Sequence, residues 1–317
     1  MKAAIVRGAG QTPVYGDFAA PVPSAEENRI RVAAAALSHL VKGRAAGTHY
    51  SSQGRFPFVA GIDGVGRLDD GRRVYFVMPK APNGSMAEET VVPAAQCLSL
   101  PDGLDDVTAA AIANPGMSSW AAFAERARLK AGETVLVNGA TGISGRLAVQ
   151  IARHFGAKKI IATGRNVDVL NALGADATIP LVEDEQALEN SFKEQLAQGV
   201  DVVIDYLWGK SAQSLLIAGA KAGADTVPIR FVQVGSMSGS DITLPAAVLR
   251  SSAIELMGSG IGSVSLSRLI SCIGELFQAT LPAGFTIAAK PVPLSDVEAA
   301  WSDDDSARRI VFTVGLR

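Results

Sequence analysis

The chain has 317 residues, which is the size of two ordinary domains or one large one. Its 29 lysines and arginines nearly balance 31 aspartates and glutamates, giving a net charge of −2. This balance argues against a nucleic acid or an anionic membrane surface as the main partner. Hydrophobic residues make up 48% and charged residues 19%, which predicts a large buried core and excludes a disordered chain.

Membrane insertion and export are also disfavoured. No uninterrupted apolar run approaches the roughly 18 residues of a membrane-spanning helix. The first residues, MKAAIVRGAG, predict an edge strand rather than a signal peptide. The two cysteines, Cys97 and Cys272, lie too far apart in sequence to indicate a disulfide framework or a cysteine-rich zinc site. We therefore expect a cytoplasmic protein with no membrane segment.

The pattern of apolar runs changes along the chain. Residues 1–113 contain short runs (AAIV, RIRVAAAAL, RVYFVM, ETVVP) separated by Pro, Gly, Asn and Asp, which predicts a β-rich region. Beyond about residue 130, the runs ETVLVNGA, KKIIATG, DVVIDYLW and RFVQVGS are nearly all apolar, as is typical of strands covered on both faces. Helical patterns lie between them, which predicts an α/β fold with a doubly wound parallel sheet. The final run, RIVFTVGLR, predicts a strand that rejoins the first region.

The strongest chemical signal is the segment VNGATGISGRLAVQIA at residues 137–152. It predicts a strand, a glycine-rich turn of pattern A-x-G-x-x-G, and a helix that begins near Ile143 and ends at Gly156. Free N–H groups at a helix start suit a pyrophosphate. Gly142 lets the backbone approach the phosphates, and Gly145 lets the helix lie close to the sheet. An ordinary tight turn is the alternative. The predicted cofactor contacts are Ala140, Thr141, Gly142, Ile143 and Ser144.

The end of the next strand indicates which dinucleotide binds. An NAD site normally has Asp or Glu there, to bind the ribose 2′-hydroxyl. Here the residues are Gly164, Arg165 and Asn166, with no acid before Asp168. The Arg165 guanidinium can grip a 2′-phosphate, so we predict NADPH as the cofactor. A solvated surface arginine is the alternative.

Several segments together resemble a known family. FPFVAGIDGVGRL, DGRRVYF, NGSMAEETVVPAAQCLSLPDGL, GMSSWAAF and the glycine-rich turn occur in this order over nearly the whole chain. Their order and spacing resemble the medium-chain dehydrogenase/reductase superfamily, specifically its zinc-free quinone-oxidoreductase branch. The resemblance implies a GroES-like β-rich catalytic domain at residues 1–113 and 290–317, and a Rossmann domain at 114–289. It also implies an active site between the domains and a homodimer paired through an edge strand at AIELMGSG.

The resemblance further implies cofactor contacts at strand ends and on one helix. Ser118 would touch the nicotinamide ribose or carboxamide, and Tyr206 would lie in the loop after the fourth Rossmann strand. Six further residues follow the fifth and sixth strands and would also contact the cofactor: Gly235, Ser236, Met237, Gly258, Ser259 and Gly260. For the glycines among them, a simple turn at the strand end is the alternative.

Two segments of the sequence depart from the family pattern, and they affect the predictions about a metal site and about the substrate. Zinc-dependent relatives have an early cysteine and a Gly-His-Glu segment, where this chain has Ser38 and Gly61-Ile62-Asp63. An isoleucine cannot bind zinc, so we predict no metal site. The branch's Asn-Pro-x-Asp stretch is replaced by the four residues from Ser38 to Val41, which leaves the substrate open.

Hydride delivery to a quinone, or to the β-carbon of an enone, leaves a negative oxygen that needs a proton. Tyr50, in GTHYSSQG, matches the loop where family members place an active-site tyrosine, and a phenol stays protonated at neutral pH. A tyrosine packed at the cleft edge, or His49 as the donor, are alternatives. Tyr206 and Lys210 also fit the Y-x-x-x-K pair of short-chain dehydrogenases, although Tyr206 directly follows a predicted strand.

These observations predict a zinc-independent, NADPH-dependent oxidoreductase that transfers a hydride to a small-molecule quinone or α,β-unsaturated carbonyl. Two alternatives stay open. One is an NADPH-binding regulatory or structural protein with little turnover. The other is an alcohol dehydrogenase-like enzyme, which would carry zinc and reduce NADP in the presence of alcohol.

Overall fold

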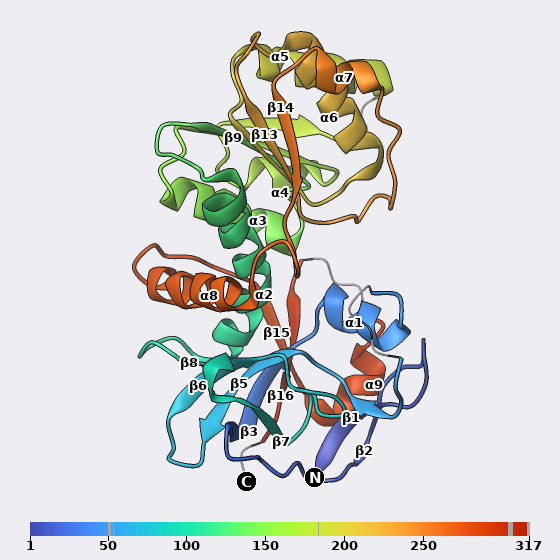
Figure 1. Ribbon diagram of the computed structural model, residues 1–317, viewed down its shortest axis with the longest axis vertical. Helices are drawn as coiled ribbons and strands as arrows, with labels where there is room; N and C mark the ends of the chain where they lie inside the picture. The colour runs from blue at the N-terminus through green and yellow to red at the C-terminus, as the bar shows by residue number, and fades with distance from the viewer. Residues whose placement is uncertain (50–51, 53, 183, 304–306, 316–317) are drawn as a thin grey trace. The chain divides into compact units, whose positions relative to one another are not determined.

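The chain forms two compact units. The computed structural model describes residues 1–49, 52, 54–182, 184–303 and 307–315. A terminal unit comprises Met1–Asn114, Phe277–Pro282 and Thr286–Arg317, and a central unit comprises Pro115–Leu276 and Ala283–Phe285. The chain thus passes from the first unit into the second and returns, as the colours of Figure 1 trace.

The central unit is built on a six-stranded sheet in which every neighbouring pair is parallel. Its spatial order is β11-β10-β9-β12-β13-β14, which confirms the predicted doubly wound sheet. Every residue of β9 is buried, which explains why this run is apolar without alternation. The strands are β9 (Thr134–Asn138), β10 (Lys159–Gly164), β11 (Ala177–Pro180), β12 (Val202–Asp205), β13 (Ile229–Gln233) and β14 (Ile254–Gly258).

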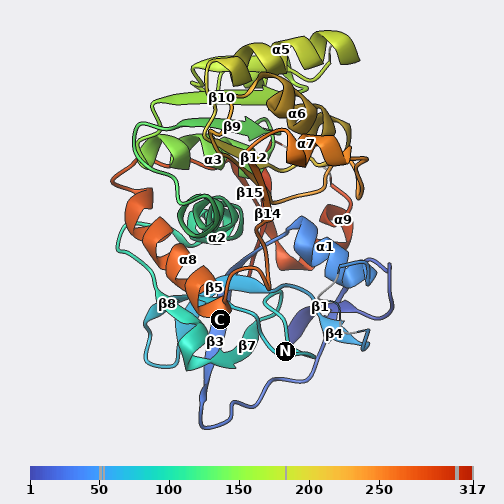
Figure 2. The ribbon, with the colours of Figure 1, turned by 45° about the horizontal axis from the view of Figure 1, so that its top comes forward.

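Helices cover both faces of this sheet. α5, α6 and α7 lie together on one face and α3 lies on the other (Figures 1 and 2). No helix in the described ranges is long and apolar enough to span a lipid bilayer. The helices are α2 (Asp106–Ala121), which starts in the terminal unit, η2 (Ala122–Ala127), α3 (Ile143–His154), α4 (Val167–Asn171), α5 (Glu185–Ala197), α6 (Gly209–Ala222), α7 (Ala246–Arg250) and α8 (Leu266–Thr280), which ends in the terminal unit.

Helix α3 follows from its sequence. It begins at Ile143, and Gly156, just beyond its end, has φ +83°. Glycine adopts this left-handed conformation without steric penalty, so it ends the helix where the pattern predicts. The buried positions of α3, among them Leu147, Ala148 and Ile151, recur at helical spacing.

The terminal unit is β-rich. A seven-stranded sheet has the path β15-β16-β3-β5-β6-β8, with β7 paired to β3, and a three-stranded sheet has the order β2-β1-β4. The last strand, β16, pairs antiparallel with β3, so both ends of the chain build this unit. Its elements are β1 (Lys2–Val6), β2 (Val14–Asp17), β3 (Glu27–Ala36), α1 (His39–Ala46), β4 (Phe58–Val59), β5 (Asp63–Leu68), β6 (Arg73–Val77), β7 (Glu89–Pro93), η1 (Ala94–Gln96), β8 (Cys97–Ser99), β15 (Ala289–Pro293), η3 (Leu294–Asp296), α9 (Val297–Ala300) and β16 (Arg309–Thr313).

The prediction that the first strand is an edge strand is wrong. β1 lies between β2 and β4, and pairs antiparallel with both. Residues 3–6 are all buried. The small side chains of Ala3 and Ala4 fit a strand enclosed by its neighbours, and the short run alone did not reveal those neighbours.

Candidate dinucleotide-binding site

The glycine-rich turn joins β9 to α3 at the point where the strand order reverses. β10 lies on one side of β9 and β12 on the other, and ligands of doubly wound sheets bind outside the carboxyl ends of strands at such a switch point. A β-carbon on Gly145 would lie 2.3 Å from the Gly139 carbonyl oxygen, so the helix packs directly on the turn. A β-carbon on Gly142 would meet only that oxygen, at 3.8 Å, which leaves open space above the turn.

The start of α3 fits a phosphate group. Its N-cap is Gly142, which has no side chain to accept hydrogen bonds from the first turn. The first backbone N–H groups of a helix have no intrahelical acceptors, and the helix dipole adds positive potential there. The Gly142 N–H donates to the Gly139 carbonyl at a long distance of 3.4 Å. Open space, the free N–H groups of the residues that follow Gly142 and positive potential therefore coincide at this turn, as a pyrophosphate requires.

A buried polar network holds the ends of three strands together. Asn138 Nδ2 donates to Asp205 Oδ1 at 2.8 Å and to Ser211 Oγ at 3.0 Å, and the Thr163 hydroxyl donates to Asn138 Oδ1 at 2.7 Å. Gly139 N donates to Thr163 Oγ1 at 3.1 Å. The turn is thus anchored to β10 and β12 by side chains that the sequence analysis did not select. Single polar residues at the ends of apolar strands are the signal that marks them.

The end of β10 touches the turn. A β-carbon on Gly164 would lie 2.3 Å from Thr141 Cγ2, so only glycine fits there without displacing Thr141. Asn166 is engaged as the N-cap of α4, because its Oδ1 accepts from Val169 N at 3.1 Å. Arg165 is exposed and forms no ion pair with any described residue.

Tyr206 directly follows β12, and its hydroxyl is already paired. Its Oη forms a 2.7 Å hydrogen bond with Ser119 Oγ, and burial raises the pKa of the Tyr206 phenol well above its usual value. Ser118 donates its hydroxyl to the Pro115 carbonyl at 2.8 Å. Lys210 is exposed. Tyr206 therefore shows no arrangement that would activate it as a proton donor.

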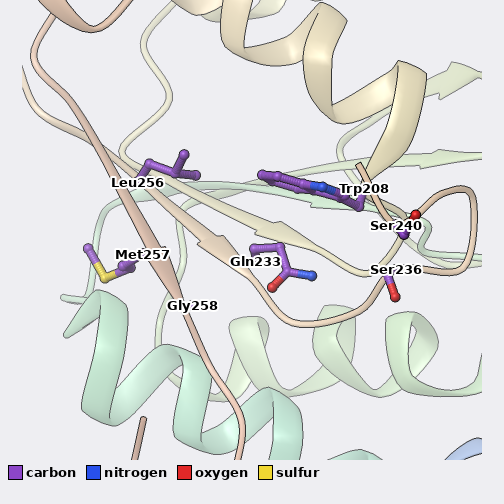
Figure 3. A pocket seen from close by; sticks show the side chains of 7 residues that line it. All are labelled: Trp208, Gln233, Ser236, Ser240, Leu256, Met257 and Gly258. Carbon is purple, nitrogen blue, oxygen red and sulfur yellow. The ribbon is translucent and has the colours of Figure 1, made fainter. Parts of the chain in front are cut away.

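A pocket of about 460 Å³ lies at the carboxyl ends of β13 and β14 (Figure 3). It brings together two predicted contact residues, Ser236 and Gly258. Met237 is 61% exposed and does not line this pocket. The lining residues are Trp208, Gln233, Ser236, Ser240, Leu256, Met257 and Gly258.

The other predicted residues at these strand ends are held by main-chain hydrogen bonds. Gly235 N donates to the Asp205 carbonyl at 3.1 Å, and a β-carbon on Gly235 would approach the Tyr206 carbonyl oxygen to 2.7 Å. Ser259 N donates to the Gln233 carbonyl at 2.8 Å, and Gly260 N donates to Ser263 Oγ at 2.8 Å. These positions shape the loops, and their contact with a cofactor stays a prediction.

Trp208 is a lining residue that the sequence analysis missed. Its φ of +56° and ψ of −153° fall in a region that is nearly restricted to glycine. Its backbone N–H donates to both carboxylate oxygens of Asp205, at 3.2 and 3.1 Å, which holds this conformation. The sequence signal that could have identified Trp208 is a large aromatic residue shortly after an apolar strand.

In the terminal unit, the predicted donor Tyr50 lies outside the described residues. Burial, assisted by the nearby Arg44 charge, lowers the pKa of His49, which favours the neutral form of this imidazole. Ser38 Oγ accepts from Val41 N at 3.1 Å and caps α1, and Ile62 is buried in a hydrophobic cluster. In the part of the chain that the structure describes, no group of three or more His, Cys, Asp or Glu side chains is placed to hold a metal ion.

The reversed strand order, the glycine turn at the switch point and the separate β-rich unit define a two-unit dinucleotide-binding fold. A family model described as zinc-binding dehydrogenase matches residues 144–275. The probable NADPH-dependent quinone reductase tdiC of Emericella nidulans is 28% identical, over 93% of this chain and 94% of its own length. Crystal structures of the quinone oxidoreductase from Thermus thermophilus, which include a complex with NADPH, match at 25% identity with a TM-score of 0.83, over 99% of this chain and 100% of that one. These likenesses support the medium-chain dehydrogenase/reductase superfamily, in its quinone oxidoreductase branch, as the family of this chain.

Some relatives are much longer proteins. A mycocerosic acid synthase-like polyketide synthase of Mycobacterium tuberculosis is 31% identical over 71% of this chain. The chain spans 11% of the length of that synthase. Its likeness to this chain is therefore confined to a small part of the synthase.

Proposed function

We propose that the protein is a zinc-independent oxidoreductase that transfers a hydride from NADPH to a quinone or an α,β-unsaturated carbonyl. The observation that carries the proposal is the glycine turn at the switch point, beside a strand end that presents Arg165 and no carboxylate. The relative from Emericella nidulans is described as a probable NADPH-dependent quinone reductase, and the structures of the quinone oxidoreductase from Thermus thermophilus include a complex with NADPH. Both support the same cofactor and substrate class.

The chain's own residues would divide the work as follows. Bound NADPH supplies the hydride. Residues 142–145 would bind the pyrophosphate through backbone N–H groups, and Arg165 would bind the 2′-phosphate. The loops that carry Ser236 and Gly258 would contact the nicotinamide half, as the family resemblance implies.

We propose Tyr50 as the residue that donates to, or orients, the substrate oxygen. The paired hydroxyl of Tyr206 supports this choice, since that phenol is buried and bonded to Ser119. The exposed Lys210 gives no support to a Tyr–Lys pair of the short-chain type. Tyr50→Phe is therefore the variant in which we expect turnover to fall while NADPH binding persists.

We also propose that turnover needs no zinc and that the protein acts as a cytoplasmic homodimer. Ile62 offers no ligand atom, and the Ser38 hydroxyl is occupied as a helix cap. β14 ends the central sheet and carries Leu256, which is 39% exposed. An exposed strand edge can pair with the same edge of a second copy, which supports dimer formation there.

The decisive experiment is stopped-flow oxidation of NADPH by the purified protein against panels of quinones and enones, with metal analysis of the same sample. We expect NADPH consumption with substoichiometric zinc. Tight NADPH binding without consumption would favour a regulatory or structural protein instead. Bound zinc together with alcohol-dependent NADP reduction would favour an alcohol dehydrogenase.

Cofactor selection has its own test. Arg165→Ala should weaken NADPH binding about tenfold or more and NADH binding by less than about threefold, because a charge-assisted phosphate contact contributes on the order of 1.5–3 kcal/mol. Calorimetric dissociation constants for both coenzymes measure this. Arg250→Ala, which removes another exposed arginine, is the matched control. Equal weakening of both coenzymes would contradict the role of Arg165.

A further inference from the structure

Arg146 lies in the first turn of α3, immediately after Gly145, and its side chain folds back over the glycine-rich turn. Its Nε donates to the Thr141 carbonyl at 2.9 Å, which fixes the plane of the guanidinium. The side chain is partly buried rather than extended into solvent. An arginine held by Nε alone keeps its two terminal nitrogens available as donors.

The same turn residue touches the end of β10. Thr141 Cγ2 occupies the space that a β-carbon on Gly164 would need, and Arg165 follows Gly164. Arg146 and Arg165 therefore flank one contact, between Thr141 and Gly164. This edge of the turn lies next to the end of β10. In a Rossmann site, residues at that strand end bind the adenosine ribose.

The charge at this edge is not balanced by the protein. Within the central unit, Arg153, Arg230 and Arg268 each pair with a carboxylate, at distances of 2.5–2.9 Å. Among the described residues, Arg146 has no such partner, and its guanidinium donates instead to a neutral carbonyl, that of Thr141. A cation in the first turn of a helix also faces the positive end of the helix dipole. An anion bound at this edge would pair with the Arg146 charge and would offset the repulsion between that charge and the positive end of the helix dipole.

We infer that Arg146 is a second arginine for the 2′-phosphate of NADPH, acting beside Arg165; this rests on the proposed function. Two guanidinium groups can neutralise a phosphate dianion and donate to its oxygens from two sides. The Nε bond to Thr141 holds the Arg146 fork in place before the cofactor arrives. Arg146 is thus a specificity-determining residue, and the backbone N–H groups of residues 142–145 bind the pyrophosphate in NADPH and NADH alike.

The test uses 2′,5′-ADP and 5′-AMP, which differ by the 2′-phosphate, together with NADPH and NADH. Calorimetric dissociation constants are measured for the full-length wild type, for Arg146→Ala and for Arg146→Gln, which keeps a polar side chain. Arg153→Ala is the matched control, since it removes an equal charge from the same helix, two turns further along. Far-ultraviolet circular dichroism and thermal unfolding of each variant establish that it is folded.

We expect both Arg146 variants to weaken 2′,5′-ADP and NADPH about tenfold or more, and 5′-AMP and NADH by less than about threefold. Arg153→Ala should leave all four ligands within about twofold of the wild type. Weakening of NADPH and NADH by the same factor would overturn the inference and assign Arg146 to the pyrophosphate. Unchanged affinities would overturn it as well. Failure of the wild type to bind NADPH or 2′,5′-ADP would instead overturn the proposed function.

Discussion

Two aspartates are buried, one in each unit, and they differ in how completely their carboxylates are hydrogen-bonded. Asp205, at the end of β12, accepts hydrogen bonds from Asn138 Nδ2 and from the backbone N–H groups of Leu207 and Trp208, at 2.8–3.2 Å. Asp63, in β5, accepts one bond from the Tyr75 hydroxyl at 2.7 Å. The second oxygen of Asp63 has no hydrogen-bond partner in the described chain.

The surroundings of Asp63 do not complete its hydrogen bonding. Arg309 is also buried, and its Nε and Nη2 find no acceptor among the described residues. Burial raises the pKa of Asp63 to about 6, against the opposing effects of the Tyr75 hydrogen bond and the Arg309 charge. Burial also raises the pKa of Asp205, but three donors favour its charged form.

The difference teaches what each carboxylate does for the fold. Asp205 fixes a loop: its bonds hold Trp208 in an unfavourable backbone conformation and tie β12 to the glycine-rich turn through Asn138. Asp63 holds no loop, and its burial, which the Tyr75 hydrogen bond and the Arg309 charge only partly offset, makes its ionisation unfavourable within the fold. We therefore expect the free energy of unfolding to fall strongly when the Asp205 side chain is removed. We expect Asp63 instead to make the free energy of unfolding depend on pH.

The largest effect should come from breaking the satisfied network. Asp205→Ala leaves Asn138 and two backbone N–H groups without their acceptor, and each buried unpaired group costs about 1–3 kcal/mol. We expect the free energy of unfolding to fall by about 3 kcal/mol or more, and NADPH binding to weaken as the turn loses its anchor. Urea unfolding measures the first and calorimetry the second. Asp225→Ala, at an exposed aspartate, should change stability by less than about 0.5 kcal/mol; a similarly small change in Asp205→Ala would contradict the comparison.

The next effect concerns pH. The folded pKa of Asp63, about 6, lies above its ordinary value of 3.8, so the folded state binds this proton more tightly than the unfolded state. The resulting stabilisation is fully present below the ordinary pKa and is lost as pH rises through about 6. The loss is at most about 3 kcal/mol. Asp63→Asn, which cannot ionise, should show a smaller decline in stability between pH 4 and 7 than the wild type.

Urea unfolding at several pH values in that range measures the decline. Asp102→Asn removes an exposed carboxylate and should reproduce the pH dependence of the wild type. If Asp63→Asn also reproduced it, the buried carboxyl would not be the group that titrates.

The smallest expected effect concerns the hydrogen bond between Tyr206 and Ser119 in the central unit. Tyr206→Phe removes the hydroxyl bonded to Ser119, but Ser119 also donates to the Pro115 carbonyl at 3.0 Å and so stays satisfied. We expect a loss of about 0.5–1 kcal/mol in the free energy of unfolding, with NADPH turnover within about twofold of the wild type. Tyr15→Phe, at a half-buried tyrosine, is the control for stability. A collapse of turnover in Tyr206→Phe would show that this hydroxyl takes part in the reaction after all.

Much of the central unit could be predicted because its signals are local. Strands buried on both faces consist of apolar runs, and the turn needs glycine at positions 142 and 145 wherever the rest of the chain lies. The absence of an acid after β10 is likewise visible in a few consecutive residues. The position of β1 between two strands was not local information, because β4 pairs with it from more than 50 residues away.

The sequence by itself therefore determined the alternation of strands and helices, the glycine-rich turn and the choice of an arginine over an acid beside it, since each depends on neighbours within a few residues. Only the tertiary structure decided which polar groups meet. Ser119 pairs with Tyr206 across 87 residues, and Asn138 reaches Asp205 across 67. Such partners are chosen by how strands and helices pack, and a hydrogen bond forms only where packing brings donor and acceptor within about 3 Å of each other.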